Sequence, residues 1–222
     1  KREKNGGEAA ARNTGFQHAR GAFIASQDSD DEWTDGKLER EITTLMKAGP
    51  RVGAAYSRVE KTFWDGTVVL LPITKGIETD GNLFRYFLEK NLITIQAATI
   101  RRECYEAIGG FDESIPSFAE WDLWIRFSKQ YEFIFIPEIG VRARVLEDSV
   151  SRDIKKRLIS REMIFQKHLS DFKQYPEICA ANAYGIGNTY ALQEQMAKAR
   201  RYLGMAATSS PLTLKYIAAF LI

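Results

Sequence analysis

The sequence has 222 residues, 45% of them hydrophobic and 27% charged, which is typical of a globular protein of one or two domains. Its 31 basic and 29 acidic side chains leave a formal net charge of +2. This balance argues against nucleic acid as a partner, because neutralising many phosphates requires a concentrated basic surface. No run reaches the roughly 20 apolar residues that span a bilayer, and the first residues lack the apolar core of a signal peptide.

The two cysteines indicate a reducing environment. Cys104 and Cys179 each lie in an apolar, helix-like stretch, where a cysteine is usually a small buried side chain rather than half of a disulfide. We therefore expect a cytoplasmic protein, with peripheral contact at the inner face of the cell membrane as the alternative. The polar start at Lys1 runs directly into a helix-like segment, so we expect the chain to begin inside a domain.

The first elements in chain order are a helix over residues 8–19, a strand over 22–27 and an acidic loop over 28–33. After Gly36 the apolar residues fall at helical spacing, which predicts a helix that buries this stripe. The stripe consists of Leu38, Ile42, Leu45 and Met46.

The following elements complete an α/β pattern up to about residue 150. We expect strands over 51–56, 67–71, 93–100, 132–137 and 141–145, and helices over 81–90, 102–108 and 120–130. Gly109 and Gly110 end the second of these helices at low steric cost. Alternating strands and helices predict a mainly parallel sheet, with antiparallel pairing possible at its edge.

Residues 151–222 have helical stripes and no convincing strand, which predicts an appendage of two to four helices. The final apolar segment, residues 211–222, is too short to span a membrane. It is expected to pack on these helices, with docking at a membrane surface as the alternative.

Three carboxylates follow the predicted strand at 22–27. Asp28, Asp30 and Asp31 crowd the end of that strand, where ligands bind in open α/β sheets. Their repulsion is relieved by a cation, and Mg²⁺ or Mn²⁺ prefers such oxygen ligands. The alternative is a loop that caps the next helix, a role that Thr34 or Asp35 can fill without the other acids. We favour a metal site that bridges to a diphosphate.

Three segments together resemble inverting glycosyltransferases of family 2, which have the nucleotide-diphospho-sugar transferase (GT-A) fold. These are GGEAAARNTGFQHARGAFIASQDSDDEW (residues 6–33), GGFDE (109–113) and EWDLWIRF (120–127). They occur in the family order, and the resemblance covers about residues 5–151. It implies a GT-A mixed sheet flanked by helices in residues 1–150, followed by the helical region 151–222.

The resemblance implies specific roles for the acidic residues. Asp28 and Asp30 would form the Asp-X-Asp pair that binds Mn²⁺ or Mg²⁺ and the sugar diphosphate, with Asp31 as a supporting charge. Glu120 occupies the position of the general base, where the family has aspartate, and Asp122 is the reserve candidate. A carboxylate is needed because a sugar hydroxyl is a poor nucleophile until its proton is accepted. The alternative is that Glu120 and Asp122 are first-turn acids favoured by the helix dipole.

Five further residues match family segments. Arg12 would lie near the nucleotide and Asn13 would support the loop, although a solvated arginine is equally compatible. Asp112 is the candidate hydrogen-bond partner of an acceptor hydroxyl, or else it caps a turn. Trp121 and Trp124 are either packing residues or part of the acceptor site.

The sequence also departs from the family pattern. Leu146 stands where the family often has a metal-ligating histidine, and neither His18 nor His168 lies in a matching position. The strand and acidic loop that seat the nucleoside base have no counterpart in residues 1–20.

We expect a metal-dependent transferase that takes a nucleotide-diphosphate sugar as donor and a saccharide or lipid-linked hydroxyl as acceptor. A non-catalytic carbohydrate-binding or scaffold relative is the main alternative. A nucleotidyltransferase is disfavoured because no glycine-rich, lysine-bearing phosphate loop is present.

Overall fold

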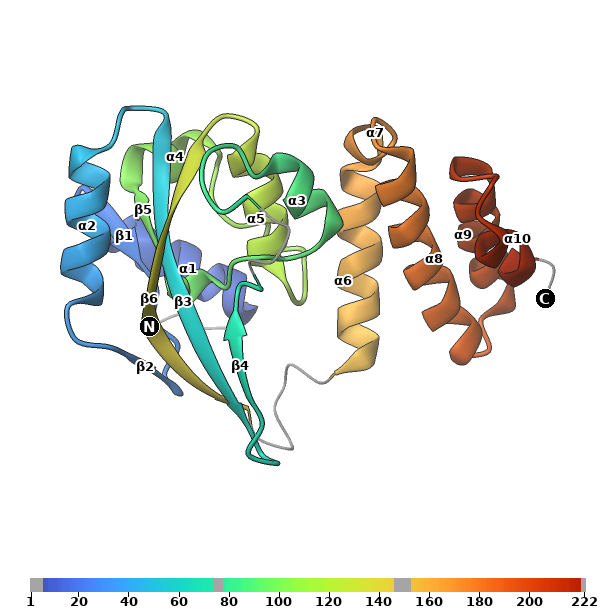
Figure 1. The fold of residues 1–222 in the computed structure, drawn as a ribbon, viewed down its shortest axis with the longest axis horizontal. Helices are drawn as coiled ribbons and strands as arrows, with labels where there is room; N and C mark the ends of the chain where they lie inside the picture. Colours follow the sequence, from blue (N-terminus) through green and yellow to red (C-terminus); the bar gives the residue numbers. More distant parts are fainter. Residues whose placement is uncertain (1–5, 74–77, 146–152, 221–222) are drawn as a thin grey trace. The chain divides into compact units, whose positions relative to one another are not determined.

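The computed structural model describes residues 6–73, 78–145 and 153–220 (Figure 1). The chain divides into two compact units, Lys1–Arg152 and Asp153–Ile222. The elements of the first unit are, in chain order, α1 (Gly7–His18), β1 (Phe23–Ala25), β2 (Asp31–Trp33), α2 (Lys37–Lys47), β3 (Val52–Phe63), β4 (Val68–Leu71), α3 (Phe84–Glu89), the 3₁₀ helix η1 (Ile95–Ala97), β5 (Ala98–Arg101), α4 (Arg102–Ala107), α5 (Ala119–Ser128) and β6 (Glu132–Val145). The elements of the second unit are α6 (Ile154–Lys167), α7 (Leu169–Phe172), α8 (Pro176–Leu192), α9 (Met196–Ser209) and α10 (Leu214–Phe220).

The first unit is built on one mixed sheet with the strand order β1-β5-β3-β6-β2, and β4 pairs with β3. This confirms the predicted α/β class and mixed sheet. The expectation that the sheet is mainly parallel is wrong for the described strands, because only β3 and β6 run parallel. One reason is local: β4 returns antiparallel from β3 through a tight turn, in which Gly66 has φ +82° and the Asp65 carboxylate accepts from the Thr67 amide.

Two strand boundaries differ from the sequence prediction at the β6 edge. Residues 31–33, expected to be loop, form β2 by pairing antiparallel with β6. Residues 132–145, expected to be two strands, form one strand whose register with β3 shifts around Pro137. Proline has no amide hydrogen to donate to a ladder, which accounts for the interruption. In addition, Ile95–Ala97 in the middle of the strand expected at 93–100 form η1, and the strand β5 is limited to Ala98–Arg101.

Helix α2 forms where expected but buries a different face. Its buried residues are Lys37, Glu41 and Leu45, whereas Leu38 is 37% exposed and Met46 is 71% exposed. The predicted apolar stripe is therefore wrong, because the buried face of the helix is shifted from it by about one residue position. Leu45 packs on the sheet as expected, within a cluster of buried apolar residues.

A buried ion pair replaces the expected apolar stripe of α2. The Lys37 Nζ and Glu41 Oε2 atoms are 2.7 Å apart, and both side chains are almost fully buried. Glu41 also accepts hydrogen bonds from the Ser57 hydroxyl at 2.7 Å and the Thr99 hydroxyl at 2.6 Å. The Lys37 ammonium lies 4.6 Å from the centroid of the Trp33 ring. The charges are thus satisfied by hydrogen bonds, which burial of a charge requires.

An aromatic core packs on the opposite side of the central strands from α2, under α3 and α5 (Figure 1). Phe133 of β6 lies 5.3 Å from Phe87, 5.7 Å from Trp124 and 5.3 Å from Phe127, measured between ring centroids. The α5 helix is therefore tied directly to the sheet through rings that are fully buried.

The second unit is helical throughout its described residues, 153–220, which confirms the expected helical C-terminal region. These described residues form five helices rather than two to four, although α7 is a single turn of four residues. The apolar and small residues of α8 and α9 follow the spacing L-G-x₂-Y…A-x₃-F…P of one tetratricopeptide repeat. These positions are Ile186, Gly187, Tyr190, Ala199, Leu203 and Pro211.

Packing of α8 against α9 predicts that Gly187→Ala destabilises the second unit by about 2 kcal/mol, since over-packing a core typically costs that much. A Cβ at Gly187 would lie 2.8 Å from the Leu203 Cγ and 3.1 Å from the Leu203 backbone nitrogen. Urea denaturation measures the change. Gly185→Ala in the same helix is the control, because its Cβ meets only the flexible end of Arg161. Equal stability of the two variants would contradict the close packing.

The last described helix, α10, packs on α9 and buries Tyr216, and Phe220 lies against Gly204. This favours packing of the final apolar segment, although Leu212 is 94% exposed. No helix in the described ranges is long and apolar enough to cross a bilayer. Both cysteines are free and buried, as expected.

Candidate functional site

Arg12 joins α1 to the acidic segment that follows β1. Its Nη2 donates to the Asp28 Oδ1 at 2.6 Å, and its Nε donates to the Ser26 hydroxyl at 3.3 Å. Glu8, one helical turn earlier in α1, forms an ion pair with the same guanidinium. The Arg12 side chain is only 10% exposed, so it is a fixed part of the site rather than a solvated surface arginine.

The charge on Arg12 also connects the two acidic segments. Burial lowers the pKa of the Arg12 guanidinium, but the carboxylates of Glu8 and Asp28 raise it, and the net pKa lies above its usual value. Glu120, from the second acidic segment, adds to this increase in pKa. Asp28 and Glu120 are 92 residues apart in the sequence, and the fold brings both within electrostatic range of one cation.

Asp30 and Asp31 differ sharply in environment. Asp30 is exposed, whereas Asp31 is partly buried at the start of β2 and accepts from the Gln96 Nε2 at 2.7 Å. Burial raises the pKa of Asp31, and the charges of Asp28 and Asp30 raise it further, against the opposing hydrogen bond from Gln96. Asp31 is thus held toward the protein, and Asp30 is the carboxylate presented to solvent.

The acidic segment offers a partial metal site. Nowhere in the described residues do three or more His, Cys, Asp or Glu side chains gather as a ready-made metal cage. Asp28 and Asp30 nevertheless provide two carboxylates, and Mg²⁺ is commonly held by one or two carboxylates together with substrate phosphates and water. The residues therefore fit a cation that arrives with a diphosphate. Leu146, which stands where the family often has a metal-ligating histidine, lies outside the described residues.

Glu120 lies in the first turn of α5 and is partly exposed. Its Oε1 accepts a hydrogen bond from the Asn91 Nδ2 at 2.8 Å. Burial raises the pKa of Glu120, and the charge of Glu8 raises it further. The Asn91 hydrogen bond and the Arg12 charge act in the opposite direction. A carboxylate with a raised pKa holds an accepted proton more tightly than an ordinary glutamate does, and Glu120 is also partly accessible to solvent.

Asp122, the reserve candidate for the base, occupies a structural position. Its side chain is fully buried and forms a 2.8 Å ion pair with the Arg126 Nε. Arg126 in turn donates to the carbonyl oxygens of Ile108 and Gly110, each at 2.6 Å. The pair fixes the end of α4 and the following loop. Burial in this position contradicts a role for Asp122 in proton transfer to a substrate.

The two tryptophans of α5 are packing residues. Trp121 is 6% exposed and Trp124 is fully buried, and each indole N–H donates to a backbone carbonyl, of Phe87 at 2.6 Å and of Ile93 at 2.7 Å. This burial favours the packing alternative over a place in the acceptor site. The physical reason is that an indole buries a large apolar surface while its single donor finds a main-chain partner.

Asn13 supports the 109–113 loop, as the resemblance implied. Its side chain donates to the Phe111 carbonyl at 2.9 Å and accepts from the Phe111 amide at 2.9 Å and the Tyr105 hydroxyl at 2.6 Å. Gly110 has φ +72°, and a Cβ there would collide with Tyr105 and Asn13. Asp112 accepts from the amide and hydroxyl of Ser114, which favours the turn-capping alternative for this residue.

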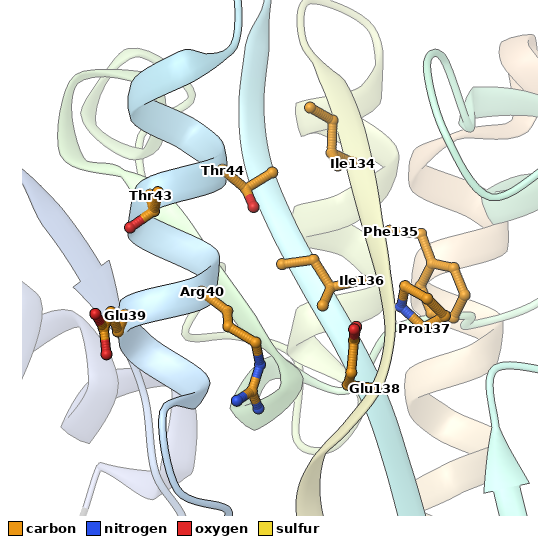
Figure 2. A pocket seen from close by; sticks show the side chains of 9 residues that line it. All are labelled: Glu39, Arg40, Thr43, Thr44, Ile134, Phe135, Ile136, Pro137 and Glu138. Atoms are coloured by element: carbon orange, nitrogen blue, oxygen red, sulfur yellow. The ribbon is translucent and has the colours of Figure 1, made fainter.

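A separate groove of about 500 Å³ lies between α2 and β6 (Figure 2). Its lining residues are Glu39, Arg40, Thr43, Thr44, Ile134, Phe135, Ile136, Pro137 and Glu138. None of the site residues predicted from the sequence lines it, so the groove and the Arg12-centred site are different places on the first unit.

Sequence reasoning missed four residues that shape the site: Glu8, Asn91, Gln96 and Arg126. Glu8 is four residues before Arg12, which is a recognisable helical ion-pair spacing. Asn91 and Gln96 carry no comparable signal, because their partners Glu120 and Asp31 lie 29 and 65 residues away.

Comparisons with known proteins show similarity to glycosyltransferases. Residues 1–109 match glycosyl transferase family 2. YwdF of Bacillus subtilis, an uncharacterized glycosyltransferase, is 27% identical over 142 residues, which cover 61% of this chain and 49% of the relative. WfgD of Escherichia coli, a UDP-Glc:alpha-D-GlcNAc-diphosphoundecaprenol beta-1,3-glucosyltransferase, is 51% identical over 41 residues, which cover 18% of this chain and 16% of the relative.

Two solved structures share the fold. Residues 1–349 of TarS from S. aureus superimpose with a TM-score of 0.64 at 14% identity, over 98% of this chain and 64% of that TarS chain. The mannosyltransferase PcManGT from Pyrobaculum calidifontis, in complex with GDP-Man and Mn²⁺, gives a TM-score of 0.54 at 19% identity, over 100% of this chain and 59% of that protein.

The fold is that of GT-A proteins, and the chain is similar in sequence to glycosyltransferases. The similarity to glycosyl transferase family 2 covers residues 1–109. The chain spans about half the length of the first curated relative that it matches.

Proposed function

We propose that the chain carries the donor diphosphate site and the catalytic base of a metal-dependent, inverting glycosyltransferase. The transferred group is a sugar from a nucleotide-diphosphate sugar, and the acceptor is a hydroxyl of a saccharide or lipid-linked glycan in polysaccharide or cell-envelope biosynthesis. The observation that carries the proposal is the pair of interactions made by Arg12. Its guanidinium donates a hydrogen bond to Asp28 of the acidic segment, and the charge of Glu120 raises its pKa. One small region therefore holds both groups that the reaction requires.

In the proposed reaction Glu120 accepts the proton of the acceptor hydroxyl as its oxygen attacks the anomeric carbon. The bond from that carbon to the diphosphate oxygen breaks at the same time, its electron pair leaves with the nucleoside diphosphate, and the anomeric configuration inverts. Asp28 and Asp30 would hold Mn²⁺ or Mg²⁺, which when bound supplies Lewis-acid stabilisation of the leaving diphosphate. Arg12 keeps Asp28 oriented and adds positive charge beside the diphosphate site.

Two relatives support the chemical class of donor and acceptor. The PcManGT complex contains GDP-Man and Mn²⁺, a nucleotide sugar with a divalent cation. The name of WfgD describes transfer of glucose from UDP-Glc to a lipid diphosphate sugar. A lipid-linked acceptor would require peripheral contact with the cytoplasmic face of the membrane, and we include this contact in the proposal.

Calorimetric titration of UDP and GDP into the protein, with and without Mn²⁺, tests the donor site. We expect one of the two nucleotides to bind in a Mn²⁺-dependent manner and Asp30→Ala to weaken this binding by at least about tenfold, because Asp30 is the exposed carboxylate of the pair. Asp35→Ala, an exposed aspartate outside the segment, is the matched control. Mn²⁺-independent binding, or equal binding by both variants, would contradict the proposed donor site.

A further inference from the structure

Asn91 makes a direct contact with the carboxylate of Glu120. It lies between α3 and η1, and its Nδ2 donates to the Glu120 Oε1 at 2.8 Å. The Oδ1 of the same amide is buried and has no hydrogen-bond partner among the residues that the structure describes. Leaving a buried acceptor unpaired costs stability, and such exceptions in a folded protein call for an explanation. Within the described residues, the hydrogen bond to the Glu120 carboxylate is therefore the contact that orients the amide.

The helix that carries Glu120 also holds the backbone on both sides of Asn91. The Trp121 indole donates to the carbonyl of Phe87, four residues before Asn91, and the Trp124 indole donates to the carbonyl of Ile93, two residues after it. Both indoles are buried. The Asn91 segment and Glu120 are consequently fixed to the same rigid element, so their separation is set by α5 rather than by a free loop.

We propose that Asn91 is a positioning residue for Glu120, which holds the carboxylate in one orientation and stabilises its ionised form. The inference rests on the proposed function of Glu120 as the base. A neutral amide suits this role because it donates to one carboxylate oxygen without neutralising the charge that accepts the proton. The hydrogen bond is made to the Oε1 atom of the carboxylate.

The pKa of Glu120 is raised by burial and lowered by a hydrogen bond from its own backbone N–H, and groups on two other segments also affect it. From α1, Arg12 favours the ionised carboxylate and Glu8 disfavours it, while Asn91 favours it from the α3–η1 segment. Removing the Asn91 donor therefore shifts the ionisation of Glu120 to higher pH. It also frees the carboxylate to rotate, which lowers kcat more than it raises KM for the donor.

The test is carboxyl-detected ¹³C NMR titration of the purified protein labelled at glutamate, with the Glu120 signal assigned from its absence in Glu120→Gln. The variants are Asn91→Ala, Asn91→Asp and the control Asn82→Ala. Asn82 also flanks α3, but its side chain contacts the Ser128 carbonyl and the Phe84 amide rather than Glu120. We expect the titration midpoint of Glu120 to move to higher pH in Asn91→Ala and further in the nearly isosteric Asn91→Asp, and to stay unchanged in Asn82→Ala.

A second readout separates this inference from the proposed function. With Mn²⁺ present, hydrolysis of UDP- and GDP-sugars is followed as nucleoside diphosphate release, and we expect Asn91→Ala to lower kcat by roughly tenfold with KM within about twofold. A Glu120 midpoint that does not move in either Asn91 variant overturns the inference, even if Glu120→Gln abolishes activity. If the Glu120 midpoint shifts but the protein has no transferase activity, the contact between Asn91 and Glu120 is supported and the catalytic role of the two residues is overturned.

Discussion

Replacing Glu120 with glutamine is expected to lower kcat by about 10³-fold and to change donor affinity by less than about twofold, because general-base catalysis typically contributes factors of this size. Glutamine retains the shape of the side chain and can still contact Asn91, but it cannot take the proton of the acceptor hydroxyl. Steady-state assays of sugar transfer or donor hydrolysis, combined with calorimetric donor titration, measure the two effects separately. Comparable losses in kcat and in donor affinity would instead indicate that Glu120 binds the donor.

The pH dependence gives a second signature of the same residue. The proposed mechanism requires ionised Glu120, so kcat/KM should rise as the pH increases through its pKa, which burial places above that of an ordinary glutamate. For stability the sign is opposite. The native state binds more protons than the unfolded state between the two pKa values, so this group's contribution is present at low pH and lost as pH rises through the folded pKa.

Glu120→Gln removes that ionisation and should be at least as stable as the wild type at neutral pH, which excludes misfolding as the cause of lost activity. Glu103→Gln is the matched control, since Glu103 is an exposed first-turn glutamate of α4. The Glu103→Gln variant loses the same kind of favourable interaction between a carboxylate and a helix dipole, but its kcat should be unchanged. Loss of activity in both variants would point to a helix-dipole effect rather than to a base.

Replacing Lys37 with methionine is expected to lower the free energy of unfolding by about 3–5 kcal/mol, the cost of leaving a buried charge without its partner. Glu41 would remain fully buried with hydrogen bonds from Ser57 and Thr99 but without its counter-ion. Denaturation in urea measures the change.

Two variants complete this experiment. Lys37→Met combined with Glu41→Leu should recover most of the lost stability, because an apolar pair of similar volume often replaces a buried ion pair at little cost. Lys47→Met, at an exposed lysine of the same helix, should stay within about 0.5 kcal/mol of the wild type. A stable Lys37→Met variant would show that Glu41 does not depend on the lysine.

The α2 helix shows where periodicity succeeds and where it fails. Spacing of apolar residues correctly predicts a helix near residues 37–47, since this depends on local backbone geometry. The buried face is another matter, because Lys37 and Glu41 become favourable inside only when Ser57 of β3 and Thr99 of β5 supply hydrogen bonds. No window of sequence contains those three elements, and hydrophobicity alone assigns the charges to the surface.

The site divides in a similar way. Asp28, Asp30 and Glu120 are recognisable from the sequence, because an acidic cluster after a strand and an acid at a helix start are local patterns that also match a family. The roles of Asp122, Trp121 and Trp124 are not recognisable, since adjacent positions on α5 point in different directions. Glu120 is partly exposed to solvent, whereas Trp121 and Asp122 next to it are buried.

By itself the sequence determined the class of fold, the helical nature of residues 153–220, the resemblance to a glycosyltransferase family and the positions of the two acidic segments. Each of these depends on spacing within one element or on a contiguous motif. Only the tertiary structure decided that the sheet is mostly antiparallel, that Arg12 contacts Asp28 within electrostatic range of Glu120, and that Asn91 contacts Glu120. The physical reason is that strand pairing, burial and pKa arise from residues that are distant along the chain and become neighbours only when the sheet and its helices have packed.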